Sequence, residues 1–337
     1  MKKTGVLAVN LGTPDAPTRG AVYRYLKQFL LDPRVIDYSW LPRNLLVRGI
    51  IAPFRSGSSA KLYQHLWTPE GSPIKFYGER LVDGIRAINN DEYTIELAMR
   101  YQNPSLESAL EKLLEAQVDR IVVFPLFPQY ASATTGSIHD EVMRLLRKQQ
   151  TIPEVAMINS YPTLPGMINT FSENAKKYNL ADYDHVLFSY HGLPQRQLKK
   201  GDRTGQHCLK VEDCCNVLCS SNKMCYSSQC HQTSHAIAEK LGIENYTVCF
   251  QSRLGPEAWA QPYTSAVIEE NLEKGNKNLL VFSPAFVADC LETTIEIGYE
   301  YKEEFQEKGG EKLDLVESLN DHPEWIKTAH ELISSYC

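Results

Sequence analysis

A row of acidic residues near the C-terminal end is the part of the sequence best suited to chemistry. Asp289, Glu292, Glu296 and Glu300 follow one another at positions i, i+3, i+7 and i+11. On a helix this spacing places all four carboxylates on one face, about one turn apart. Like charges so placed repel one another, so the row does not serve helix stability. We expect it to bind a cation or pass protons; the alternative is a solvated acidic helix face.

His191 is the second candidate for chemistry. It lies in the segment SYHGLP (189–194), directly after an apolar run that is typical of a strand. A histidine titrates near neutral pH and can accept a proton or bind a metal. A single loop histidine is more often incidental, but this one and the acid row follow two different strands at equivalent ends. That pairing favours a functional site.

The elements that would position these residues alternate between strands and helices, which is typical of a parallel α/β sheet. In such sheets ligands bind at the carboxyl ends of the strands, where both candidates lie. We expect strands at 6–9, 93–99, 120–124, 154–159, 185–189, 246–250, 279–282 and 313–317, and helices at 105–116, 137–148, 263–274 and 323–335.

The two halves of the sequence resemble each other. VLAVNLGTP (6–14) is similar to VLFSYHGLP (186–194), and MRYQNP (99–104) to FQSRLGP (250–256). We therefore expect two α/β domains of similar, Rossmann-like topology, residues 1–160 and 161–337, with a cleft between their strand ends. No GxGxxG or Walker A sequence is present, which argues against dinucleotide chemistry and P-loop hydrolysis.

The segment 30–54 interrupts this alternation. It is strongly apolar and contains Arg34, Arg43 and Arg48. It is either a buried helix or an apolar lip, able to hold a flat hydrophobic ligand or to touch a membrane surface.

Composition narrows the function classes. The chain has 337 residues, 43% of them hydrophobic, and a net charge of −6. With no basic stripe, nucleic acid is not expected as a partner. The sequence has neither a signal-like N-terminus nor a run of ~18–20 apolar residues, so we expect a cytoplasmic protein. Six of nine cysteines lie between 208 and 230, and without an export signal this favours metal ligation over disulfides.

Six motifs, in order along the chain, resemble the ferrochelatase family. They are GSPIKFY (71–77), RYQNP (100–104), FPQYASATTGS (127–137), SYHGLP (189–194), QSRLGPEAW (251–259) and DCLETTIEIGYEY (289–301). The resemblance extends from Gly5 to about Trp325. It implies an enzyme that inserts Fe²⁺ into a porphyrin, with two Rossmann-like domains around a porphyrin cleft.

The resemblance also implies roles for individual residues. His191 would face the porphyrin centre, as the acceptor of pyrrole protons or as a ligand of the incoming iron. Glu292 would lie opposite it, and Glu296 would continue the acidic path as a further Fe²⁺ ligand. The residues expected to contact the porphyrin are Asn10, Leu11, Arg100, Tyr101, Ser132 and Trp259.

Between 201 and 229 the sequence departs from the simplest family pattern by a cysteine-rich insert. Some ferrochelatases carry a [2Fe–2S] cluster, which four thiolates hold. The resemblance implies such a cluster in this insert. We expect Cys208, Cys225, Cys230 and one of Cys214 or Cys215 as its ligands and rank Cys219 last, because it lies in a polar loop; a zinc ion held by four thiolates is the alternative.

Several alternatives remain open at the level of sequence. The substrate is protoporphyrin IX or the more carboxylated coproporphyrin III, and the apolar lip favours the former. A cobalt chelatase acting on a corrin precursor and a non-catalytic Fe–S or zinc sensor that binds haem are the other two. Further expectations are a homodimer and a peripheral contact with the inner membrane through the lip.

Overall fold

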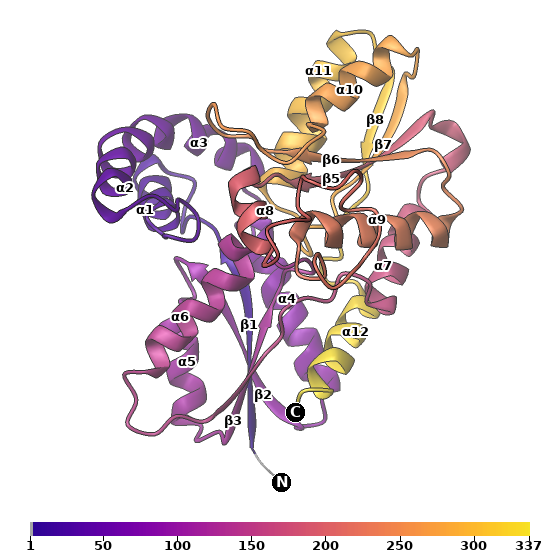
Figure 1. Ribbon diagram of the computed structural model, residues 1–337. Helices are drawn as coiled ribbons and strands as arrows, with labels where there is room; N and C mark the ends of the chain where they lie inside the picture. Colours follow the sequence, from indigo (N-terminus) through magenta and orange to yellow (C-terminus); the bar gives the residue numbers. More distant parts are fainter. Residues whose placement is uncertain (1–2) are drawn as a thin grey trace. The chain divides into compact units, whose positions relative to one another are not determined.

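The chain forms two compact α/β units, each built on a four-stranded sheet (Figure 1). The computed structural model describes residues 3–337. Unit 1 consists of residues up to 127, 131–159 and 320–337, and unit 2 of residues 128–130 and 160–319. The last segment of the chain thus belongs to unit 1, which a division by position along the sequence does not predict.

All strand pairs in both sheets are parallel. The sheet of unit 1 has the order β2-β1-β3-β4 and that of unit 2 the order β6-β5-β7-β8. This identical order confirms the expected repeat and the α/β fold class, and each expected strand is present. The bounds are β1 (Thr4–Gly12), β2 (Tyr93–Tyr101), β3 (Arg120–Pro125), β4 (Glu154–Met157), β5 (His185–His191), β6 (Tyr246–Gln251), β7 (Asn278–Phe282) and β8 (Lys312–Leu315).

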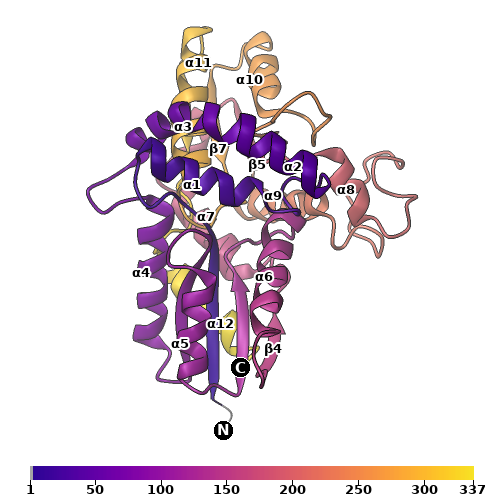
Figure 2. The same ribbon diagram turned by 90° about the vertical axis from the view of Figure 1, so that its left-hand side faces the viewer.

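Helices cover both faces of the sheet of unit 1 (Figures 1 and 2). Helices α5 (Leu106–Glu115) and α6 (Ser137–Leu146) share a buried core with one sheet face. Helices α4 (Pro73–Ile88) and α12 (Pro323–Ser334) cover the other, where the fully buried Trp325 lies 6.4 Å from the Phe124 ring. These two helices can approach closely because Gly84 has no side chain. A Cβ at that position would lie only 2.5 Å from Ile326.

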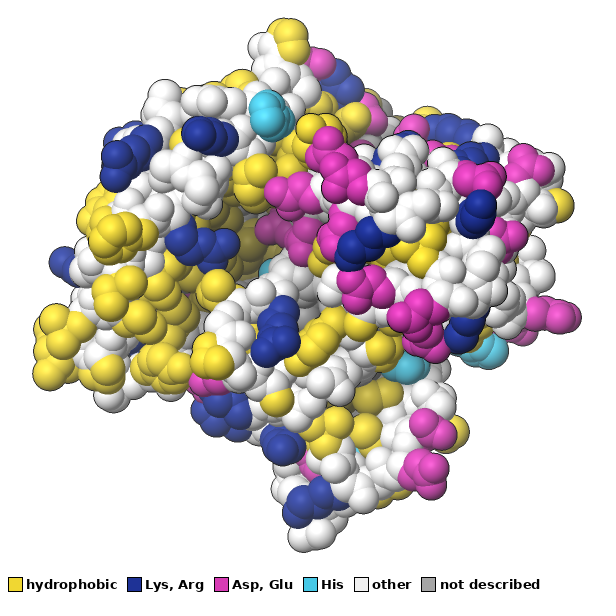
Figure 3. Space-filling view, turned by 90° about the horizontal axis from the view of Figure 1, so that it is seen from above, with side chains coloured by type: hydrophobic (Ala, Val, Ile, Leu, Met, Phe, Trp, Pro, Cys, Tyr) yellow, Lys and Arg dark blue, Asp and Glu magenta, His cyan; other side chains and the backbone are white. Residues whose placement is uncertain are grey.

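The apolar segment 30–54, which we call the lip, buries Leu30, Val47 and Ala52 in a small core of its own but exposes most of its large apolar side chains. It follows α1 (Arg19–Leu30) and runs through α2 (Trp40–Leu46) and the π-helix η1 (Val47–Ile51) into α3 (Ala52–Leu66). Figure 3 shows hydrophobic side chains gathered over this part of unit 1. The most exposed are Trp40, Leu41, Leu45, Ile50 and Phe54, at 68%, 58%, 66%, 56% and 79%. None of the helices among residues 3–337 has both the length and the apolar character needed to cross a bilayer.

The core of unit 2 lies between its sheet and the helices after β6 and β7. It unites residues of α10 (Thr264–Glu273), the π-helix η4 (Leu291–Tyr301) and α11 (Lys302–Glu307) with the strands. On the other face, the buried Tyr190 donates its hydroxyl proton to the Cys230 carbonyl of α9 (Tyr226–Leu241). The remaining helices are α7 (Pro165–Ala175), η3 (Leu180–Asp182) and α8 (Gln195–Gly201) in unit 2 and the π-helix η2 (Ser132–Gly136) in unit 1.

The acid row differs from the expected four-residue helix face in one respect. Asp289 precedes η4, whose N-cap is Cys290, and its carboxylate accepts hydrogen bonds from the Thr293 hydroxyl and the Ser318 amide, both at 3.3 Å. Glu292, Glu296 and Glu300 lie on η4. A π-helix closes i→i+5 hydrogen bonds, so a spacing of four residues falls just short of one turn and keeps these three on one face.

Candidate active site

His191 is the last residue of β5 and is partly exposed. Its Nδ1 lies 2.7 Å from the Gly192 carbonyl oxygen. Because a carbonyl only accepts, Nδ1 carries the proton, which leaves the Nε2 lone pair to accept a proton or to ligate a metal. The Trp259 ring lies 6.4 Å from the imidazole, and the Tyr226 hydroxyl donates to the His191 carbonyl at 2.9 Å.

Gln251 connects the strand of His191 to the acid helix. His191 and Gln251 are register partners at the ends of β5 and β6. The Gln251 backbone carbonyl accepts a hydrogen bond from the Gly192 amide at 2.9 Å. The Gln251 side-chain amide donates to the Glu292 carbonyl oxygen at 2.9 Å and to Glu296 Oε2 at 3.3 Å. Its Oε1 accepts from the Ser189 hydroxyl at 2.6 Å.

The Glu296 carboxylate is held by neighbours on both sides. Oε1 accepts from the Ser252 amide at 2.9 Å and from the Tyr301 hydroxyl at 3.2 Å, and Oε2 accepts from the Ser252 hydroxyl at 2.5 Å. Ser252 has a φ of +64°, an uncommon conformation for a residue with a side chain. The carboxylate thus holds a strained turn directly after β6.

The other acids of η4 differ in environment. Glu292 lies against the buried thiol of Cys290, whose pKa is raised by burial and then by the Glu292 charge. The pKa of Glu300 is raised as well, first by desolvation and then by the charge of Glu296. Glu300 therefore binds a proton more readily than an isolated glutamate does.

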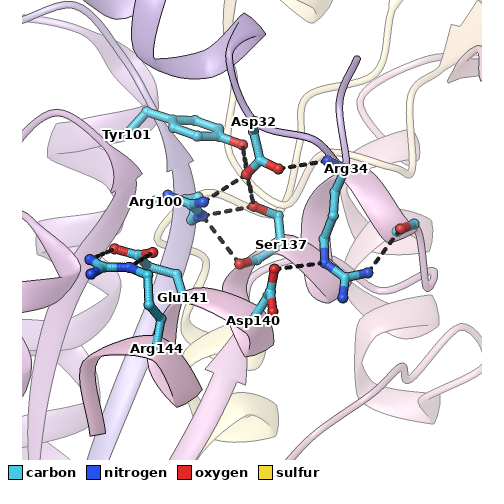
Figure 4. Close-up of polar contacts among 9 residues, drawn as sticks. Asp32, Arg34, Arg100, Tyr101, Ser137, Asp140, Glu141 and Arg144 are labelled. Carbon is cyan, nitrogen blue, oxygen red and sulfur yellow. Dashed lines mark hydrogen bonds and ion pairs between the residues drawn. The ribbon is translucent and has the colours of Figure 1, made fainter. Parts of the chain in front are cut away.

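In unit 1 the candidate residues join a buried network (Figure 4). Asp32 Oδ2 accepts from Arg100 at 2.7 Å, from the Tyr101 hydroxyl at 2.9 Å and from the Ser137 hydroxyl at 2.5 Å. Tyr101 is fully buried, and burial followed by the Asp32 charge raises the pKa of its phenol, which stays protonated and donates. Arg100 and Tyr101 thus make strong contacts inside unit 1.

Ser132 accepts a hydrogen bond from Arg34 at 3.2 Å. Arg34 also pairs with Asp140 at 3.2 Å, as Figure 4 shows. Of the lip arginines, Arg43 is buried and donates to the Tyr38 carbonyl at 2.9 Å, whereas Arg48 is exposed. Arg43 therefore supports the lip from within.

Asn10 and Leu11 lie near the end of β1. Asn10 is buried and its Oδ1 accepts from the Leu11 amide at 2.8 Å. The chain can turn there because Gly12 has a φ of +116°, and a Cβ at Gly12 would lie 2.0 Å from the Tyr101 carbonyl oxygen.

Most thiols of the cysteine insert gather around Cys225. Hydrogen bonds from Cys208 and then Cys215 lower the pKa of Cys225 to about 3, and the pKa values of these two donors are raised. Cys214 Sγ lies 3.8 Å from Cys215 Sγ. Cys230 is fully buried in α9, and burial raises the pKa of its thiol. Cys219 is exposed and lies 4.0 Å from His207.

These thiols do not form a ready metal site. Within residues 3–337, no three or more His, Cys, Asp or Glu side chains are arranged to hold a metal ion. Metal ligation would displace the protons that Cys208 and Cys215 donate to Cys225. The donor set, soft sulfur from four or more positions, fits an iron–sulfur cluster or zinc.

The sequence analysis missed three residues with clear structural roles: Asp32, Gln251 and Ser252. Asp32 had no distinguishing signal, because the same segment also contains Asp37 and three arginines. Gln251 and Ser252 open the motif QSRLGPEAW, but nothing in their residue types indicates what they bind.

Two parallel sheets of identical strand order, each unit with polar groups at its strand ends, define a chelatase-type fold. The solved structure of SirB from Bacillus subtilis with Fe³⁺ matches with a TM-score of 0.54 and 12% identity, over 99% of this chain and 95% of that one. The sirohydrochlorin chelatase SirB from Bacillus subtilis subspecies spizizenii in complex with cobalt matches with a TM-score of 0.51 and 11% identity, over 98% of this chain and 93% of that one. At these identities the likeness shows the fold alone.

Comparison with sequences identifies the family. The ferrochelatase family model matches residues 3–336. A ferrochelatase of Legionella pneumophila (strain Corby) is 43% identical over 334 residues, which cover 98% of this chain and 99% of the relative. One of Coxiella burnetii (strain Dugway 5J108-111) is 45% identical over 328 residues, covering 96% and 91%. The chain belongs to the ferrochelatase family.

The buried network predicts a large effect for Asp32→Ala. The substitution leaves the Arg100 guanidinium, only 13% exposed, without its charged partner, and breaking such a pair costs about 3–5 kcal/mol. Asp140→Ala is the matched control, since it removes the exposed pair with Arg34, worth at most about 1 kcal/mol. Urea unfolding followed by circular dichroism measures both. Equal losses of stability would contradict this account of the network.

Proposed function

We propose that this chain inserts Fe²⁺ into protoporphyrin IX in haem biosynthesis, with release of two protons. Membership of the ferrochelatase family supports the reaction class. The single observation that carries the site is the connection from His191 through Gln251 to the acid helix at Glu292 and Glu296. It joins a base to a row of carboxylates within one unit, as metallation requires.

The chemistry assigns a role to each of these groups. Replacing two pyrrole protons by Fe²⁺ needs a base, and the Nε2 lone pair of His191 supplies one. Glu292 and Glu296 offer hard oxygen ligands that accept Fe²⁺ without trapping it as thiolates would. Glu300, with its raised pKa, continues the row as a proton acceptor. Glu292 and Glu296 are therefore the proposed ligands of the iron substrate. His191 is either the base or, through the same Nε2 lone pair, a further ligand.

Binding contacts away from the metal would hold and distort the macrocycle, which exposes its nitrogens. We assign these contacts to Leu11, Arg100, Ser132 and Trp259, and we assign to the buried Asn10 and Tyr101 the role of holding Leu11 and Arg100 from within unit 1. Trp259 is supported by its position beside the His191 imidazole.

The lip supports protoporphyrin IX over coproporphyrin III. Additional substrate carboxylates need unpaired arginines, but Arg43 is buried against backbone carbonyls and Arg34 is paired with Asp140. The exposed residues of the lip are mainly apolar. Arg48 is the residue that favours coproporphyrin III as the second candidate, and turnover of the two porphyrins side by side distinguishes them.

We expect purified protein to convert Fe²⁺ and free-base protoporphyrin to haem under anaerobic conditions. His191→Ala should lower kcat at least a thousandfold because it removes the base, while circular dichroism stays that of the wild type. Glu292→Gln should act in the same direction, since it removes charge and basicity with little change in shape. Wild-type turnover in either variant would refute the assigned roles, and an inactive wild type that binds haem would favour the sensor.

The lip also supports a peripheral membrane contact. Its five most exposed apolar side chains form a patch on α2, η1 and the start of α3, with Arg48 and Arg55 beside them in sequence. An apolar face flanked by cations is suited to the interface of a bilayer with anionic lipids.

Sedimentation with anionic vesicles tests this contact. The paired substitution Trp40→Glu and Phe54→Glu should abolish co-sedimentation, because it places charge where the patch would enter the lipid. Val217→Glu is the control, since that side chain is 76% exposed but lies in the cysteine insert. If all three proteins sediment equally, the lip is not the contact. A homodimer remains the second partner proposal, and light scattering measures it directly.

We further propose that the insert holds a [2Fe–2S] cluster. The proposed ligands are Cys208, Cys225, Cys230 and one of Cys214 or Cys215, and the hydrogen bonds of Cys208 and Cys215 to Cys225 favour Cys215 as the fourth. When bound, the cluster would add binding free energy to a loop that has little apolar surface to bury. Iron insertion needs no electron transfer, so the cluster is assigned to the fold of the insert and not to the reaction.

The protein should therefore purify brown, with visible absorption that dithionite bleaches. Cys225→Ser should lose the colour and lower the melting temperature without altering the KM for porphyrin. Cys337→Ser, at an exposed cysteine outside the insert, should keep both. A colourless protein with one equivalent of zinc would overturn the cluster and leave the proposed activity standing.

A further inference from the structure

We propose that Gln251 is a positioning residue, which fixes the acid helix η4 against the end of β5 and thereby sets the geometry between His191 and Glu292. This inference rests on the proposed function of those two residues. Gln251 itself is only 2% exposed, and the roles described above give it no part in binding substrate.

The side-chain amide and the backbone carbonyl of Gln251 bond to residues on or next to the two elements that carry His191 and Glu292. The side-chain nitrogen donates to two oxygens of η4, the Glu292 carbonyl and Glu296 Oε2. The side-chain oxygen accepts from Ser189, two residues before His191 on β5. The backbone carbonyl accepts from Gly192, the residue after it. One buried side chain therefore joins both elements that carry the proposed catalytic groups.

Only an amide meets this set of partners. The two oxygens on η4 require a donor and the Ser189 hydroxyl requires an acceptor, so neither a methionine nor a glutamate satisfies all three. The contact is also tight, because a Cβ at Gly192 would lie 2.9 Å from the Gln251 carbonyl oxygen. If packing alone mattered at position 251, an apolar residue of similar length would serve there.

The titratable groups around the amide are His191 on β5, Cys249 on β6, and Glu292, Glu296 and Tyr301 on η4. If Gln251 holds η4 in place, the charge of Glu292 acts on His191 at a fixed distance. A change at position 292 then alters the surroundings of the His191 imidazole, and the size of that alteration depends on Gln251.

A double-mutant cycle read by NMR tests the dependence without relying on turnover. We expect Glu292→Gln to shift the NMR resonances of the His191 imidazole, measured at one fixed pH, in the wild-type background, and the shift to shrink at least twofold in the Gln251→Met background. Asn271→Leu is the control: it removes another buried amide of unit 2, whose partners are Val267 and Asn276. In that background the shift should be unchanged.

Turnover gives the second measurement. Gln251→Met should lower kcat for iron insertion about tenfold to a hundredfold through misplacement, with the KM for porphyrin unchanged. Gln251→Glu should lower kcat as well, because a carboxylate cannot donate to the Glu292 carbonyl and would repel the Glu296 carboxylate, which lies 3.3 Å from the amide. Asn271→Leu should change neither.

The outcomes separate this inference from the function on which it rests. If His191→Ala retains full activity, the proposed role of His191 fails, and the NMR cycle still decides whether Gln251 positions the helix. If His191→Ala is inactive but both Gln251 variants behave as Asn271→Leu does, only the positioning role is overturned. An unchanged shift in the Gln251→Met background, or no shift on Glu292→Gln in any background, also overturns it.

Discussion

The candidate site of unit 2 depends on the register of β5 against β6. That pairing sets His191 beside Gln251 at the carboxyl ends of two parallel strands. Parallel pairing fixes which backbone groups meet, and a shift by one residue would turn each side chain to the opposite face. With the register fixed, the Gln251 amide meets η4, and the Glu296 carboxylate meets the Ser252 turn. The base and the acids are therefore connected through backbone geometry as well as through side chains.

The two units carry residues of different charge at the equivalent strand end. Arg100, near the end of β2, occupies the place in the repeat that Gln251 has at the end of β6. In unit 1 the Arg100 guanidinium donates to Asp32 and Ser137, so its positive charge is neutralised by Asp32 within the unit. In unit 2 a neutral amide faces a carboxylate, so the acid row keeps its negative charge. The neutral residue is the one compatible with attracting a metal cation.

The sequence predicted the strands well because each is a short apolar run that ends near Gly, Pro or a polar turn, and the repeat then fixed a common topology. It did not predict that η4 is a π-helix, because acids spaced by four residues suit both helix types. It placed Asp289 on that helix, where a cap at Cys290 excludes it. Asp32 and Gln251 were missed for a further reason: their roles lie in tertiary hydrogen bonds, which leave no periodic pattern along the chain.

Tertiary hydrogen bonds also limit the stability that the acid row costs the fold. Three carboxylates on one helix face repel, but Glu296 accepts four hydrogen bonds, from Ser252, Gln251 and Tyr301, which offset the repulsion locally. The remaining penalty falls on Glu300, whose pKa rises because of burial and the Glu296 charge. A proton bound at Glu300 relieves that repulsion, and a cation bound near Glu292 and Glu296 relieves it in another way. A row that becomes more stable on taking up either species is suited to exchanging one for the other, and exchange of protons for a metal ion is what porphyrin metallation requires.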